Sequence, residues 1–390
     1  MNLFSVRQSI VLLTVALSFV FLTATSFGET ARHVSGKQPV QGDSREMSAE
    51  RTVPTGERVG VGVVNRPANP WKLLATLPGA VIHDIAFPTP KIGYAVGEAG
   101  QVWKTTNGGV NWTEILNLNY PYYFYGVKAF SATDLVISGI YDSSTFYGLI
   151  RWSHDGGQTW TSDIQLTSTG FVQRVRFANS NDGLVMDLDD GATNSAYYTT
   201  DGGAGATDWT TVEDNPDGGW FGLEFSLLNN LHARASGINY CTSLDGGADW
   251  NCGPPIDSVF DGPVFFSNDS DGWVGGGEIS PNVEGWLHRT TDGGKTWSGR
   301  VLDISWPVRE IFFLTPKIGW AAGGNVYTNV GGMYFSSDGG QTWSLDVTTG
   351  SEMDACDGGH VGTKGQIWCA GYNLNGSFST VIYTLQGKLP

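Results

Sequence analysis

The residues of this chain with the clearest chemical potential are acidic side chains that recur in one short pattern. The pattern is a Ser or Thr, one further residue, an Asp or Asn, two glycines, and a Trp three to six residues later. Repeated carboxylates could bind a metal ion or act as acids and bases. The six copies place Asn107, Asp155, Asp201, Asp245, Asp292 and Asp338 ahead of Trp112, Trp160, Trp209, Trp250, Trp297 and Trp343.

The chemistry of the pattern favours a structural role. An Asp or Asn at the head of a turn accepts hydrogen bonds from backbone N–H groups further along, and the two glycines supply positive φ values. The Trp begins the next strand and can pack its ring between neighbouring sheets. A metal site would need His or Cys neighbours at short spacing, which the sequence lacks. We therefore predict six structural hairpins, with no metal and no cofactor.

A second set of candidates comes from aligning the repeats. The alignment brings the beginnings of the inner strands together near a central channel, where His83 and Asp84 face Glu310 as a possible acid–base set. A polar, water-filled channel is the alternative, because the alignment does not place these groups within hydrogen-bonding distance. The polar candidate residues are His83, Asp84, Arg174, Arg309, Glu310 and Asp354.

Aromatic residues follow several of the boxes, where loops should gather around the channel mouth. Exposed rings on a rigid rim suit sugar stacking or peptide docking, because they offer contact area at a small entropic cost. The alternative is packing between blades. These candidate binding residues are Tyr122, Tyr123, Tyr125, Trp220 and Phe221.

The elements that would position these residues follow from the period. Successive box tryptophans lie 48, 49, 41, 47 and 46 residues apart, which suits one four-stranded unit per repeat. After the sixth box only three strands remain, at 353–358, 366–371 and 379–385, whereas 69–74 looks like an orphan fourth strand. Its Trp71 precedes Trp112 by 41 residues. The sequence thus predicts an all-β fold: one seven-bladed β-propeller of four-stranded blades, closed by an N-terminal strand that completes the C-terminal blade.

The beginning of the chain predicts export. Residues 1–28 have a basic residue, a 13-residue apolar run at 10–22 and a small-residue ending, which is typical of a cleavable secretory signal. The run is too short to span a bilayer. Residues 29–68 resemble a disordered leader or linker, and 69–390 form the predicted propeller. We expect a protein without an integral membrane segment that is secreted, periplasmic or otherwise extracellular.

The net charge of the predicted propeller limits the classes of partner that it can bind. Residues 69–390 carry 15 basic and 33 acidic residues, a balance of −18 that should repel nucleic acid. Protein or peptide clients and neutral or basic glycans remain possible.

The four cysteines fall in two pairs. Cys241 and Cys252 flank one box, and Cys356 and Cys369 fall on adjacent strands of the closing blade. In an oxidising compartment these positions favour two local disulfides.

The repeats resemble the Asp-box, or BNR, repeat of sialidases, xyloglucanase-type hydrolases and the sortilin ectodomain. Among such families the chain is most similar to the photosystem II stability/assembly factor family, because of phrases such as 91–97 followed by 102–109. The resemblance covers roughly residues 69–388. It implies a propeller that holds a polypeptide on one face, and a thylakoid lumen location if the source is a cyanobacterium.

Departures from the enzyme families limit the chemistry. The chain has no Arg-Ile-Pro motif. Sialidases bind the substrate carboxylate with three arginines that meet at one point, and nothing in the spacing of the few propeller arginines predicts such a meeting. We therefore expect a secreted, monomeric, non-enzymatic binding or assembly scaffold. The alternative is a carbohydrate-binding protein or a glycoside hydrolase of the Asp-box propeller type, although not a typical sialidase.

Overall fold

The structure is a computed structural model that describes residues 70–385, apart from 168–170, 189–195, 213–221, 230, 238, 258–260, 279–282, 326, 362–363 and 374–377. The predicted signal and leader, together with Trp220 and Phe221, lie outside these residues. No helix in the described ranges has the length and apolar character needed to cross a membrane.

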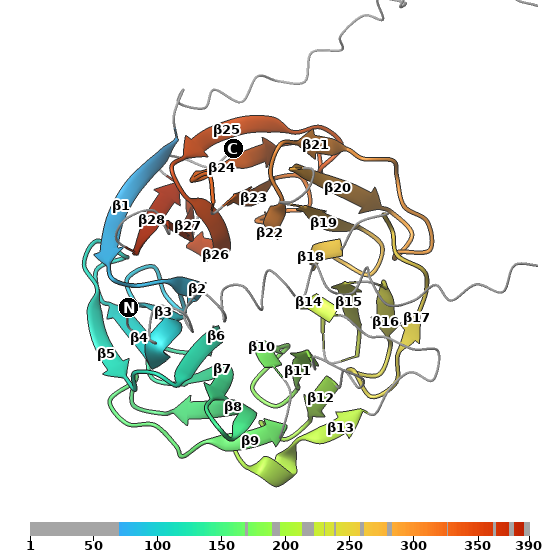
Figure 1. The fold of residues 1–390 in the computed structure, drawn as a ribbon. Coiled ribbons are helices and arrows are strands. Elements are labelled where there is room, and N and C mark those ends of the chain that lie inside the picture. Colours follow the sequence, from blue (N-terminus) through green and yellow to red (C-terminus); the bar gives the residue numbers. More distant parts are fainter. Residues whose placement is uncertain are drawn as a thin grey trace, which may run out of the picture. The chain divides into compact units, whose positions relative to one another are not determined.

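The described residues form seven four-stranded antiparallel sheets arranged in a ring (Figure 1). In six of the sheets the strands follow chain order from the centre outward, whereas in the seventh the outermost strand comes from the N-terminal end of the described chain. The predicted seven-bladed propeller is therefore confirmed.

The strands of the first four blades have the following bounds. Blade 1 contains β2 (Ile82–Ala86), β3 (Gly93–Gly97), β4 (Gln101–Thr105) and β5 (Thr113–Asn117). Blade 2 contains β6 (Tyr122–Ala129), β7 (Leu135–Asp142), β8 (Phe146–Ser153) and β9 (Ile164–Thr167). Blade 3 contains β10 (Phe171–Phe177), β11 (Gly183–Leu188), β12 (Ala196–Thr199) and β13 (Thr210–Val212). Blade 4 contains β14 (Gly222–Leu227), β15 (Ala233–Gly237), β16 (Cys241–Ser243) and β17 (Asn251–Cys252).

The remaining blades complete the ring. Blade 5 contains β18 (Asp261–Phe266), β19 (Gly272–Glu278), β20 (Glu284–Thr290) and β21 (Leu302–Ile304). Blade 6 contains β22 (Val308–Phe313), β23 (Gly319–Asn325), β24 (Val330–Ser336) and β25 (Ser344–Thr349). Blade 7 contains β26 (Glu352–Val361), β27 (Lys364–Asn373), β28 (Ser379–Leu385) and β1 (Trp71–Pro78). Two short 3₁₀ turns, η1 (Glu98–Gly100) and η2 (Ala206–Asp208), join strands in blades 1 and 3.

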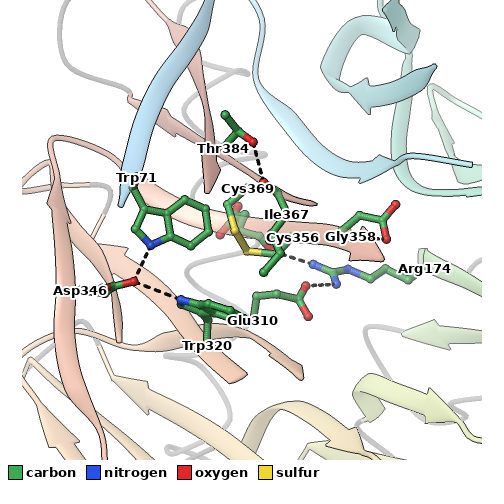
Figure 2. Close-up of a disulfide and its surroundings, with 12 residues drawn as sticks. Trp71, Arg174, Glu310, Trp320, Asp346, Cys356, Gly358, Ile367, Cys369 and Thr384 are labelled. Carbon is green, nitrogen blue, oxygen red and sulfur yellow. Dashed lines mark hydrogen bonds and ion pairs between the residues drawn. A yellow bond between two sulfur atoms is a disulfide. The ribbon is translucent and has the colours of Figure 1, made fainter. Parts of the chain in front are cut away.

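Blade 7 closes the ring as predicted, because β1 pairs antiparallel with β28 although the two strands stand at opposite ends of the chain. The indole N–H of Trp71 donates to the Asp346 carboxylate, 2.7 Å away on β25 of blade 6 (Figure 2). Trp71 is buried in one cluster with Trp320 and Met333 of blade 6. The closing strand is therefore fixed by pairing within its own blade and by packing against the next one.

The six box turns have one shared geometry. In the fifth, the Asp292 carboxylate accepts from the Thr290 hydroxyl at 2.8 Å and from the Thr296 amide at 2.9 Å. Both glycines of every box have positive φ, for example 79° and 88° at Gly293 and Gly294. In four boxes the Trp indole also donates to the carbonyl of the second glycine, as from Trp112 to Gly109 at 2.9 Å. In these four boxes the Trp thus ties the turn to the strand that follows it.

Both predicted disulfides are present. Cys241 and Cys252 are direct cross-strand partners on β16 and β17, and Cys356 and Cys369 are partners on β26 and β27. The second bond lies in the blade that closes the ring.

Candidate functional site

The inner strands share an irregularity that the sequence analysis did not predict. In all seven blades the register between the first and second strands shifts near the beginning of the first strand. Such a bulge re-aims a side chain out of the regular in-and-out alternation. The residues passed over by these shifts include His83, Tyr125, Arg174, Arg309 and Asp354. Most of the polar candidate residues that the repeat alignment grouped together therefore lie at bulges.

Arg174 crosses the centre of the ring. Its guanidinium donates to the Glu310 carboxylate at 2.9 Å and to the Asp354 carbonyl oxygen at 3.0 Å (Figure 2). These contacts join blade 3 to blades 6 and 7, which are not its neighbours around the ring (Figure 1). Burial raises the pKa of Glu310, and the nearby Arg174 guanidinium opposes that rise. Arg174 and Glu310 thus form a buried ion pair across the ring.

The Asp84 carboxylate makes hydrogen bonds and an ion pair with other groups of the propeller. Its carboxylate accepts from the backbone amides of Ile85 and Val127, both at 3.0 Å, and contacts the Arg176 guanidinium at 3.3 Å. It therefore links β2 to β6 and to β10. Within the described residues, His83, Asp84 and Glu310 make no hydrogen bonds to one another, so the acid–base set suggested by the sequence is not assembled.

His83 lies instead in a small aromatic and acidic group on the face of the propeller where each inner strand begins, here called the top face. Its ring centroid is 4.9 Å from that of Tyr125 and 5.9 Å from that of Tyr372. Its Nε2 is 4.0 Å from the Glu98 carboxylate. We call these four residues, His83, Glu98, Tyr125 and Tyr372, the His83 cluster; they come from blades 1, 2 and 7.

Burial sets the charges in the His83 cluster. Burial lowers the pKa of His83 to about 4, so its ring is neutral at neutral pH. Burial also raises the pKa of Glu98 to about 7 and the pKa values of Tyr125 and Tyr372 well above the ordinary value. Because the imidazole and both phenols are neutral near neutral pH, the Glu98 carboxylate is the one group of the cluster that can be charged there.

A second acidic group lies beside the His83 cluster. Burial raises the pKa of Asp354 to about 6, and the neighbouring Glu352 carboxylate adds to the rise. Glu352 itself accepts from the Arg309 guanidinium at 2.8 Å. Arg309 and Glu352 largely neutralise each other, as do Arg174 and Glu310, so Asp354 and Glu98 leave an acidic excess.

The predicted aromatic rim is mostly part of a strand. Tyr122, Tyr123 and Tyr125 lie in β6 rather than in a loop. Tyr123 is buried, at 7% exposure. The Tyr122 hydroxyl donates to Asp163 at 3.2 Å, and its ring lies 4.9 Å from that of Tyr141. Thus only Tyr125 of the three joins the His83 cluster.

The arginines of the propeller are already engaged. Six of them contact a carboxylate of the chain, at distances from 2.5 to 3.3 Å, and Arg234 donates to two backbone carbonyl oxygens. The six are Arg151, Arg174, Arg176, Arg289, Arg300 and Arg309. This arrangement differs from three arginines that converge on a substrate carboxylate.

Two members of the His83 cluster were missed by the sequence analysis. Glu98 begins η1, directly after the second strand of blade 1, and Tyr372 lies near the end of β27, the second strand of blade 7. In an antiparallel blade, the second strand ends at the face where the first begins. Aligning the ends of the second strands, as well as the beginnings of the first, would have exposed this signal.

Exposed apolar side chains lie on the same top face. They occur in the hairpins between second and third strands and in the loop before β6, at exposures of 39 to 55%. The residues are Tyr120, Val283, Tyr327, Val330 and Phe378. The opposite face, which carries the box turns, exposes Val110, Leu231 and Leu244.

These features define the class of protein: the described chain is a seven-bladed Asp-box β-propeller. The BNR/Asp-box repeat family profile matches residues 334–345, which contain the sixth box. No curated protein sequence gives a significant match.

Solved structures show which propellers share this fold. The chain is similar to YCF48 bound to a D1 peptide, with 19% identity, a TM-score of 0.57, and coverage of 82% of this chain and 98% of that one. It is similar to YCF48 from Cyanidioschyzon merolae, with 19% identity, a TM-score of 0.56, and coverage of 81% and 98%. The WD40 β-propeller domain of Doa1 matches with 11% identity, a TM-score of 0.53, and coverage of 81% and 97%. At these identities the likeness is one of fold.

Proposed function

We propose that this protein is a non-enzymatic, extracytoplasmic scaffold that binds a polypeptide on the top face of its propeller. The observation that carries the proposal is the concentration on that face of exposed aromatic and apolar side chains around an acidic, half-buried centre. Rigid aromatic anchors surrounded by polar groups are typical of protein recognition sites. The YCF48 structure with a bound D1 peptide gives a precedent for a propeller of this fold that holds a peptide.

The engaged state of the candidate catalytic groups supports the non-enzymatic part. Asp84 and Glu310 are held by hydrogen bonds and ion pairs that join blades, and His83 is neutral and separate from both. An acid–base pair needs groups within reach of each other and of one substrate bond.

Two disulfides support the proposed location, because such bonds persist in oxidising compartments. The proposed compartment is therefore the cell exterior or periplasm, or the thylakoid lumen if the source is a cyanobacterium.

A carbohydrate ligand is the second candidate, favoured by a row of tyrosines on blade 2. The rings of Tyr122, Tyr141 and Tyr147 follow one another at 4.9 and 5.0 Å between centroids. Such rings could stack on sugars. However, Tyr122 and Tyr147 both donate to Asp163, at 3.2 and 2.8 Å, which also accounts for the row as an internal network.

One experiment separates the two candidates. The purified protein is screened in parallel against a random peptide library displayed on phage and against a glycan array, with a reducing-sugar assay on any glycan retained. Selected peptides that protect backbone amides of β2, β6 and β27 from hydrogen exchange would support the proposal. Glycan retention without peptide selection would refute it, and release of reducing sugar would identify a hydrolase.

A further inference from the structure

The His83 cluster contains a carboxylate that lacks a cationic partner in the described part of the chain. Glu98 retains 29% side-chain exposure, and the basic group near it in the described residues is His83, 4.0 Å away, which is neutral at neutral pH. A partly buried carboxylate pays a desolvation cost that a neighbouring cation would offset. Among the residues that the structure describes, the arginines nearest the centre are engaged elsewhere: Arg174 binds Glu310 and Arg309 binds Glu352.

The same cluster contains a polar atom without a partner. The Nε2 atom of His83 is buried and makes no hydrogen bond within the described residues. Buried polar atoms in folded proteins are nearly always paired, so an unpaired one calls for an explanation. The Glu98 carboxylate lies 4.0 Å from this nitrogen and retains 29% side-chain exposure, so it is the group of the two that a ligand can reach.

Two aromatic rings flank His83. Tyr125 comes from β6 and Tyr372 from β27, so the two phenol rings approach His83 from the blades on either side of it. Rings around a carboxylate are the arrangement that proteins use for cations, because the negative face of each ring attracts positive charge. Asp354 adds a second carboxylate that has no ion pair in the described residues, and residues 69–390 carry a balance of −18.

We propose that the His83 cluster receives a lysine or arginine side chain of the polypeptide that binds the top face. The cationic head contacts Glu98 and the faces of Tyr125 and Tyr372, while the rest of the polypeptide lies on the surrounding apolar hairpins. This inference rests on the proposed function, and it specifies the chemistry of the partner: a peptide segment with an exposed basic residue.

The test uses the peptides selected on phage against the unmodified protein. Each selected peptide is synthesised with blocked termini, and its basic residue is replaced by norleucine in place of Lys or by citrulline in place of Arg. Loss of the charge should weaken binding about tenfold or more, as expected for a desolvated cation–π contact combined with a carboxylate. Comparing the Lys and Arg forms of one peptide shows which head group the cluster prefers.

Protein variants place the effect in the cluster. Glu98→Gln and Tyr372→Leu should each weaken binding severalfold, whereas Tyr372→Phe, which keeps the ring, should retain affinity. Glu114→Gln removes one charge from an exposed position on β5 and is the matched control for long-range attraction. Thermal unfolding of each variant checks that the propeller remains folded.

The outcomes are distinguishable. Selected peptides without a basic residue, or peptides whose norleucine and citrulline forms bind equally well, overturn this inference and leave the peptide scaffold standing. An equal loss from Glu98→Gln and Glu114→Gln overturns it also, because the effect would then be general electrostatics. Failure to select any peptide removes the proposed function and this inference together.

Discussion

Trp71 and Trp320 donate their indole N–H groups to the same oxygen of Asp346, at 2.7 and 3.1 Å (Figure 2). Trp71 belongs to the closing strand β1, whereas Trp320 and Asp346 belong to blade 6. One carboxylate therefore holds the N-terminal strand against a blade to which it is not hydrogen-bonded as a sheet. In the described residues the sheet partner of β1 is β28 of blade 7, so this side-chain contact is a specific point of attachment to blade 6.

Asp346→Ala should weaken closure of the ring. The substitution leaves two indole donors without their acceptor, and hydrogen bonds to a charged group contribute about 1.5–3 kcal/mol each. We expect the free energy of unfolding to fall by about 2–4 kcal/mol, measured by urea denaturation at pH 7. Asp249→Ala, at an exposed position, is the control. Equal stability of Asp346→Ala and the unmodified protein would show that the shared carboxylate is dispensable.

The two disulfides should differ in how much each contributes to the pairing of the strands that it joins. β17 consists of two residues, and one of its two register pairs with β16 is the Cys241–Cys252 pair itself. By contrast, β26 and β27 form nine register pairs, of which Cys356 and Cys369 are one. We expect Cys241→Ala with Cys252→Ala to fray β17, seen as rapid hydrogen exchange there, whereas Cys356→Ala with Cys369→Ala should leave β26 and β27 protected. Similar exchange in both double variants would contradict this expectation.

Removing one partner of the ion pair across the ring should lower the free energy of unfolding. Arg174→Met leaves Glu310 buried without its cation, and breaking a buried pair in this way costs about 3–5 kcal/mol. Adding Glu310→Gln removes the stranded charge, so the double variant should recover part of the loss. A double-mutant cycle of unfolding free energies measures the coupling. Additive losses in the cycle would mean that Arg174 acts through its bond to the Asp354 carbonyl oxygen instead.

The architecture was predictable because its signals are local and repeated. Each box combines a turn-forming Asp or Asn, two glycines and a Trp within about ten residues, and six copies fix the period. Trp71 at a similar spacing identified the closing strand, and the cysteine positions identified two hairpins. These features depend on short-range backbone geometry, which sequence patterns describe well.

The site was predictable only in part, because it depends on bulges and on contacts across the ring. The alignment grouped His83, Arg174 and Glu310, but it could not show that Arg174 would bind Glu310 and leave His83 alone. The bulges that re-aim His83 and Arg174 have no distinct residue signature here. Tyr123 lies at the beginning of β6 and is buried, since the strand starts earlier than the aromatic run suggested.

The box carboxylates should make the protein sensitive to acid. Hydrogen bonds from Thr296, first from its hydroxyl and then from its amide, lower the pKa of Asp292 to about 2. Because this pKa is lower in the folded protein, the group stabilises the fold above about pH 4 and loses that contribution as the pH falls toward 2. Asp292→Asn should therefore be less stable than the unmodified protein at pH 7, by a margin that shrinks near pH 2 in urea denaturation.

A matched box provides the control for that measurement. Asp201 occupies the same repeat position but is followed by Ala204 and Gly205 in place of the residues that lead to a threonine partner. Its carboxylate accepts from the Thr199 hydroxyl at 2.8 Å. Asp201→Asn should cost less at pH 7 than Asp292→Asn. A margin for Asp292→Asn that stays constant between pH 7 and pH 2 would show that its carboxylate charge is unimportant.

Binding of a basic peptide should strengthen as the pH rises through neutrality. The titratable groups that face Glu98 are His83, Tyr123, Tyr125 and Tyr372. The pKa of His83 is about 4 and those of the three tyrosines are raised above the ordinary value, so none of them changes charge between pH 6 and pH 8. Glu98, with a pKa of about 7, does change charge in this range.

The sign of the effect follows from the charge of the ligand. Ionised Glu98 attracts a cation and protonated Glu98 does not, so the affinity for a peptide with arginine and blocked termini should rise about fivefold from pH 6 to pH 8. Asp354, with a pKa of about 6, is about half ionised at pH 6, so it adds at most about a twofold increase over this range. Calorimetric titrations of the unmodified protein and of Glu98→Gln measure the dependence. Since glutamine does not titrate, the variant should bind weakly at both pH values and keep only the small contribution of Asp354; a fivefold pH dependence that survives in it would assign the effect to a group other than Glu98.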